Sequence, residues 1–122
     1  MNWEYLQNFI SLDGKVAIVT GASRPKGIGF AAVRALALLG ANVVISDLGG
    51  FVKGMSDECY ALGSTELLDN AVAEIKRLGG EAIAVSADLC KKEDREHLID
   101  AAIGNFGRID ILINNAASMF NT

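Results

Sequence analysis

Residues 15–29 read KVAIVTGASRPKGIG, an apolar run followed by a turn that contains three glycines. The run has the composition of a buried β-strand, and the apolar stretch after the turn, residues 30–39, has that of a helix. A glycine-rich turn between a strand and a helix is the architecture that holds a nucleotide pyrophosphate. Its glycines permit a close backbone approach, and the helix N-terminus presents free N–H groups. The stretch therefore predicts a nucleotide site beside the helix that follows it.

From residue 14 onward the chain alternates strand-like and helix-like segments. The predicted strands cover residues 15–20, 42–46, 81–86 and 110–114, and the predicted helices cover about 27–39, 65–78 and 91–106. Short, continuous apolar strands are typical of a parallel sheet that helices cover on both faces. The order predicts an α/β fold, a Rossmann-type doubly wound parallel sheet with strand order 3-2-1-4.

The domain organisation follows from this pattern. We expect an N-terminal extension over residues 1–13 and a dinucleotide-binding domain over residues 14–122, incomplete because its sheet stops after the fourth strand. In the extension, Trp3, Leu6 and Ile10 lie at helical spacing and indicate a short amphipathic helix. The fourth strand is apolar throughout, so it is expected to form an exposed hydrophobic edge that favours a homo-oligomer or another association through this strand.

The helix at residues 91–106 carries two further predictions. Cys90 is expected at its N-cap, where a thiol is a poor cap. Asp94 and Glu96 are interpreted as part of an exposed charged face, and His97, the only histidine, as a solvated position. The inward side is expected to consist of Leu98, Ile99, Ala102, Ile103 and Phe106.

Composition excludes several classes of function. The net charge of −4 argues against nucleic-acid binding. No apolar run approaches the ~20 residues of a membrane span, and the N-terminus has no basic region followed by an apolar one, so we expect a cytoplasmic protein. Cys59 and Cys90 have the spacing of neither a metal site nor a disulfide framework.

Asp47, at the end of the second predicted strand, follows Gly29 by eighteen residues. A carboxylate at this place can accept hydrogen bonds from the adenosine ribose hydroxyls and repel a 2′-phosphate, which favours NAD over NADP. Arg24 and Lys26 argue the other way, because a cation near the ribose favours NADP; they could also face the pyrophosphate or solvent. Asp47 carries more weight because the fold fixes its position, although a turn cap is the alternative.

The connection at residues 48–64 is long for a strand-to-helix loop. It lies at the carboxyl end of the second strand, on the ligand side of the sheet. One interpretation is a flap over the adenosine half of a cofactor. The alternative is a surface insertion or an interface loop.

Several ordered motifs resemble the short-chain dehydrogenase/reductase family. They are the turn at residues 20–29, Asp88-Leu89 after the third strand, and the run Asn-Asn-Ala-Ala at residues 114–117 after the fourth. The stretches LDGKVA at 12–17 and FGRIDILI at 106–113 are also similar. The similarity extends from residue 12 to about 118. Within the family, the chain most resembles bacterial members of the 3-oxoacyl reductase type.

The resemblance implies an NAD(P)-dependent oxidoreductase that transfers a hydride between nicotinamide and a carbonyl or alcohol substrate. It assigns the pyrophosphate to the turn, where the candidate residues are Gly21, Ser23, Arg24, Lys26, Gly27, Ile28 and Gly29. It assigns the adenosine half to Asp47, Asp88 and Leu89, the nicotinamide ribose to Asn114 and Ala116, and a structural tie between central strands to Asn115. Two departures stand out: the first two glycines of the turn are two residues further apart than in the family, and Ala117 replaces its usual glycine.

The resemblance also implies a catalytic serine, tyrosine and lysine. The chain has two tyrosines, and four residues after Tyr5 and Tyr60 come Phe9 and Ser64, so it contains no Tyr-x-x-x-Lys. No catalytic residue and no metal ligand is assigned within these residues. Two hypotheses remain: the cofactor-binding half of a dehydrogenase, or a non-catalytic NAD(H)-binding module that acts through a partner chain.

Overall fold

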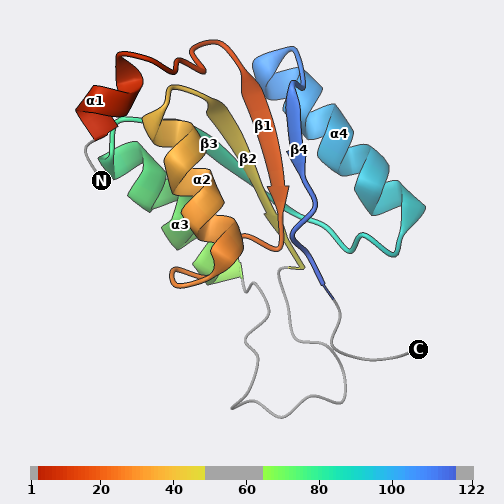
Figure 1. Ribbon diagram of the computed structural model, residues 1–122. Helices are drawn as coiled ribbons and strands as arrows, with labels where there is room; N and C mark the ends of the chain where they lie inside the picture. Colours follow the sequence, from red (N-terminus) through yellow and green to blue (C-terminus); the bar gives the residue numbers. More distant parts are fainter. Residues whose placement is uncertain (1–2, 49–64, 118–122) are drawn as a thin grey trace.

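The computed structural model describes residues 3–48 and 65–117, which form one parallel sheet with helices on both faces (Figure 1). The strand order is β3-β2-β1-β4, as the alternation of the sequence predicts. The strands are β1 (Val16–Thr20), β2 (Asn42–Asp47), β3 (Glu81–Ser86) and β4 (Ile111–Ile113), and the helices are α1 (Trp3–Gln7), α2 (Ile28–Leu38), α3 (Thr65–Arg77) and α4 (Lys92–Phe106). Most boundaries lie within a residue or two of the prediction, and β2 extends to include Asp47.

Two apolar clusters hold the helices to the sheet. Side chains alternate between the faces of a strand, so consecutive residues of β1 and β2 belong to different clusters. On the α2 and α3 side the buried side chains include Val19, Phe30, Val33, Val43, Ile45, Leu68 and Ile75. On the α4 side they include Ile18, Val44, Val85, Leu98 and Ala102. β1 is buried at every position, which explains its continuous apolar sequence.

The surface beyond α4 and β4 corrects one prediction. Ile99 and Ile103 do not point inward: they are 43% and 47% exposed. Leu112 of β4 is 54% exposed, and it lies on the same face of the sheet as its register partner Ile18. The expected hydrophobic edge at β4 is therefore confirmed, and two apolar side chains of α4 are exposed as well. We call Ile99, Ile103 and Leu112 the uncovered apolar face.

The N-terminal extension packs weakly against the domain. α1 has no fully buried residue, and the Gln7 amide donates a hydrogen bond to the carbonyl of Leu38 at the end of α2. Trp3 and Leu6 are half-buried, whereas Ile10 lies beyond the helix and is 45% exposed, so the predicted three-residue stripe is wrong at its last position. None of the helices in the described ranges combines the length and apolar composition needed to cross a membrane.

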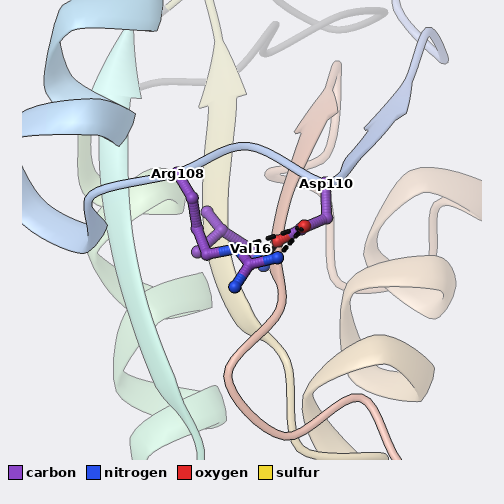
Figure 2. Close-up of polar contacts among 3 residues, drawn as sticks. All are labelled: Val16, Arg108 and Asp110. Carbon is purple, nitrogen blue, oxygen red and sulfur yellow. Dashed lines mark hydrogen bonds and ion pairs between the residues drawn. The ribbon is translucent and has the colours of Figure 1, made fainter.

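A polar contact fixes the amino end of β4 to that of β1 (Figure 2). The Asp110 Oδ2 atom accepts a hydrogen bond from the Val16 N–H at 2.9 Å, and the Asp110 N–H donates to the Val16 carbonyl at 2.9 Å. Arg108 donates to the other carboxylate oxygen from Nη2 at 2.6 Å and from Nε at 3.1 Å. The Arg108 side chain, and then the Val16 N–H, lower the pKa of Asp110 below its ordinary value.

Removal of this carboxylate tests the contact. Because the folded state lowers the pKa of Asp110, its stabilisation is present above the ordinary aspartate pKa of about 3.9 and is lost as the pH falls through the lower folded value. Asp110→Ala should reduce the free energy of unfolding at pH 7, and its difference from the unmodified protein should shrink below pH ~3.9. Urea unfolding at several pH values measures both effects.

The matched control is Asp100→Ala, which removes an exposed carboxylate of α4 that has no hydrogen bond or ion pair within the described part of the chain. This variant should leave the stability at pH 7 nearly unchanged. Equal effects of the two substitutions at all pH values would contradict the assigned role of Asp110.

Candidate functional site

All the predicted site residues of the described chain lie at the end of the sheet where the strands have their carboxyl ends. Parallel strands end on the same side, so the segments that follow β1, β3 and β4 meet there with the carboxyl end of β2 (Figure 1). Three of these segments are the turn at residues 21–27, the loop at 87–91 and the loop at 114–117. The fourth is the carboxyl end of β2, and residues 49–64 beyond it, with Tyr60 and Cys59, lie outside the described residues.

Thr20 organises the junction between β1 and the loop after β4. Its side chain is buried, and its Oγ1 atom accepts hydrogen bonds from the N–H groups of Asn115 and Ala116, both at 3.1 Å. The same hydroxyl donates to the Ile113 carbonyl at 3.4 Å. Thr20 was not among the predicted site residues; its signal in the sequence is a hydroxyl at the end of an otherwise apolar strand, directly before the first glycine.

Two glycines of the turn are needed for close packing. Gly21 has a φ of +64°, and a Cβ atom there would lie 2.8 Å from the Ala116 Cα. The Asn115 amide donates to the Gly21 carbonyl at 3.0 Å, and a Cβ on Gly29 would overlap that same amide. Asn115 thus ties the end of β1 to the loop after β4, as predicted, and it also approaches the start of α2.

The additional residues of the turn form a local loop before α2. The Gly27 N–H donates to the Arg24 carbonyl at 3.0 Å, which closes a turn around Pro25 and Lys26. Gly27 is the N-cap of α2, and no side chain caps the helix. The N–H groups of the first helical turn have no acceptor within an α-helix, so this end of α2 offers donors to an anion. Ile28, at the first position, is 84% exposed.

The cations of the turn differ in exposure. Lys26 is exposed, whereas Arg24 is half-buried. A cleft of about 350 Å³ opens beside this turn between α2 and α3, and its lining includes Ser23, Arg34, Asn70 and Glu74. The glycine turn therefore contributes Ser23 to the lining of a cleft between the two helices.

Asp47 is bound to the glycine turn in this structure. Its Oδ2 atom accepts hydrogen bonds from the Ser23 hydroxyl at 2.6 Å and from the Ser23 N–H at 3.2 Å. Its Oδ1 atom accepts one from the Leu48 N–H at 2.8 Å. The carboxylate is half-buried, and the Ser23 side chain is 1% exposed.

The loop after β3 corrects the prediction for the start of α4. The N-cap is Lys91 and not Cys90, because the Lys91 N–H first closes a turn onto the Asp88 carbonyl at 2.9 Å. Asp94 is not simply part of a charged surface: its Oδ2 atom accepts from the Asp88 N–H at 2.7 Å. The Asp88 side chain accepts from the Cys90 N–H at 3.0 Å, and Leu89 packs partly against the α4 cluster.

The remaining candidates are placed as follows. Asn114 and Ala116 are exposed at the carboxyl end of β4. His97 is exposed on α4, as predicted, and Tyr5 is 61% exposed in α1. Within residues 3–48 and 65–117, no group of three or more His, Cys, Asp or Glu side chains could hold a metal ion.

Comparisons with known proteins agree with this geometry. The family model described as short chain dehydrogenase matches residues 15–122. An uncharacterized oxidoreductase of Methylorubrum extorquens is 44% identical over 105 residues, which are 86% of this chain and 36% of the relative. A 3-oxoacyl-[acyl-carrier-protein] reductase of Synechocystis is 43% identical over 106 residues, 87% of this chain and 36% of that protein.

A solved structure shows the same arrangement. The crystal structure of carveol dehydrogenase from Mycobacterium avium in complex with NAD has a TM-score of 0.75 and 28% identity, and the match covers 86% of this chain and 36% of that one. This chain therefore spans about a third of the length of each of these three proteins.

The close approach at Gly21 can be tested against a glycine of similar conformation. Gly14 has a φ of +77° but nothing within 4 Å of an added Cβ. Gly14→Ala should destabilise the protein by about 1–2 kcal/mol through backbone strain alone. Gly21→Ala should destabilise it by about 3 kcal/mol or more, because the Ala116 backbone must also move. Urea unfolding of both variants measures the difference, and equal losses would show that the contact with Ala116 is unimportant.

Proposed function

The chain belongs to the short-chain dehydrogenase family, and from this we propose that it forms the cofactor-binding part of an NAD(P)-dependent oxidoreductase. The observation that carries the proposal is the meeting of four segments at one edge of the sheet around the uncapped start of α2. When bound, the nicotinamide cofactor supplies a site that accepts or donates a hydride. The substrate class that we propose is a carbonyl compound or the corresponding alcohol.

The turn and α2 fit a pyrophosphate. Gly27 leaves the helix start without a side-chain cap, so N–H donors and the positive end of the helix dipole remain available for negative charge. Gly21 and Gly29 keep side chains out of the junction and let the turn lie close to the loop after β4. Arg24 and Lys26 add positive charge beside the same turn. We assign the pyrophosphate to this segment.

The adenosine half is assigned to the ends of β2 and β3. Asp47 presents a half-buried carboxylate at the end of β2, which can accept a hydrogen bond from a ribose hydroxyl and disfavours a 2′-phosphate. Asp88 and Leu89 lie in the loop after β3, where we propose that they contact the adenine. These assignments favour NAD over NADP.

The nicotinamide half is assigned to the loop after β4. Thr20 and Asn115 hold this loop against β1, so the backbone of Asn114 and Ala116 is fixed before a cofactor arrives. We propose that these two residues lie beside the nicotinamide ribose. We also propose that the serine, tyrosine and lysine of the reaction come from polypeptide other than these 122 residues.

The uncovered apolar face supports the proposal that the catalytic residues come from other polypeptide. Ile99, Ile103 and Leu112 are each more than two-fifths exposed, whereas both faces of a central parallel strand are normally covered. We propose that this face is a contact surface for the catalytic part of the protein or for another subunit. Leu112 precedes Asn114 by two residues, so a partner that covered β4 would adjoin the proposed nicotinamide end of the site.

Replacement of Asp47 tests the cofactor assignment. Asp47→Ala in the intact protein should weaken NAD binding about tenfold or more, because a hydrogen bond to a charged group contributes ~1.5–3 kcal/mol. NADP binding should be unchanged or tighter, since a negative charge near the 2′-phosphate is removed. Isothermal titration calorimetry with each nucleotide measures both dissociation constants.

Glu81→Ala is the matched control, because it removes one negative charge from the opposite end of the same sheet. It should change neither constant. Tighter binding of NADP than of NAD by the unmodified protein would refute the assigned preference, and binding of neither nucleotide would refute the cofactor site.

A further inference from the structure

Ser23 lies in the glycine turn with its side chain enclosed by protein. It is 1% exposed, although it lines the end of the cleft between α2 and α3. The preceding residue, Ala22, donates its N–H to the Ser46 carbonyl at 3.1 Å, so the turn runs along the end of β2. This path brings Ser23 beside Asp47, from which it is separated by 24 residues in the sequence.

Both hydrogen-bond donors of Ser23 point to one oxygen of Asp47. The hydroxyl contact of 2.6 Å is in the short range expected for an O–H donor on an ionised carboxylate. The N–H contact is 3.2 Å. With the Leu48 N–H on the other oxygen, the described residues occupy three of the roughly four acceptor positions of the carboxylate.

We propose that Ser23 is a positioning residue for Asp47 and, through it, a determinant of the preference for NAD over NADP. This inference rests on the proposed function of the site. Ser23 holds the carboxylate in one orientation before the cofactor binds, so the ribose does not have to order it. It also sets the distance between the pyrophosphate turn and the ribose-binding acid, because one residue belongs to the first and contacts the second.

The same contact explains how a single carboxylate can discriminate. A mobile Asp47 could turn toward the cations of the neighbouring turn when a 2′-phosphate approaches, and the repulsion would then be weak. A carboxylate held on both oxygens stays in place, and its negative charge opposes the phosphate at short range. Loss of the Ser23 hydroxyl should therefore reduce affinity for NAD and reduce discrimination against NADP together.

Ser23→Ala is compared with Ser46→Ala in the intact protein. Ser46 is also 1% exposed and precedes Asp47 directly, but its hydroxyl has no hydrogen-bond partner among the described residues. Both variants remove one buried oxygen from the same edge of the sheet. Ser23→Cys is measured as well, because it fills the same space with a much weaker donor.

The readout is the ratio of the dissociation constants for NADP and NAD, obtained by calorimetry. Ser23→Ala and Ser23→Cys should each weaken NAD binding about fivefold to tenfold and lower the ratio by at least as much. Ser46→Ala should leave both constants unchanged. A general loss of structure would weaken both nucleotides equally and leave the ratio constant, which would overturn the proposal.

A double-mutant cycle with Asp47→Ala gives the second test. If Ser23 acts through the carboxylate, Ser23→Ala should have no further effect on NAD binding once Asp47 is gone. The same fold-change in both backgrounds would overturn the positioning role. Failure of the proposed function is distinct, because the unmodified protein would then bind neither nucleotide.

Discussion

The contact between Gly21 and the Ala116 backbone is the constraint on which the rest of the site depends. A Cβ on Gly21 would lie 2.8 Å from the Ala116 Cα, so the two segments can meet only because the residue that follows β1 has no side chain. Thr20 then accepts hydrogen bonds from the N–H groups of Asn115 and Ala116. The Asn115 amide donates to the Gly21 carbonyl and lies where a Cβ on Gly29 would be.

The two ends of the sheet are fastened by different means. At the amino end, Asp110 joins the first residue of β1 to the start of β4 through a carboxylate that Arg108 also contacts. At the carboxyl end, hydroxyl and amide groups join the same two strands while leaving the start of α2 without a cap. Unused donors thus remain at the end where a negatively charged ligand is proposed to bind, while the opposite end supports the sheet.

Sequence patterns predicted the elements well because the strands and turns depend mainly on neighbouring residues in the sequence. Continuous apolar runs located β1, β2 and β3, and the glycines located the turns. The prediction failed where burial depends on neighbours: Ile99 and Ile103 have the spacing of a buried face, but no described segment covers them. The Ser23–Asp47 contact could not be predicted, because it depends on the path of the turn across the end of β2. Cys90 was misplaced because an extra turn precedes α4.

The two halves of the proposed cofactor site differ in what holds them in place. The pyrophosphate and adenosine half is assigned to the turn, the end of β2 and the loop after β3, and these are held by contacts within the described chain. The nicotinamide half is assigned to Asn114 and Ala116, which follow an edge strand whose Leu112 is 54% exposed. A partner that covered β4 would therefore adjoin the proposed nicotinamide end of the site. Affinity for the adenosine half and placement of the nicotinamide ring are thus expected to respond to different parts of the protein.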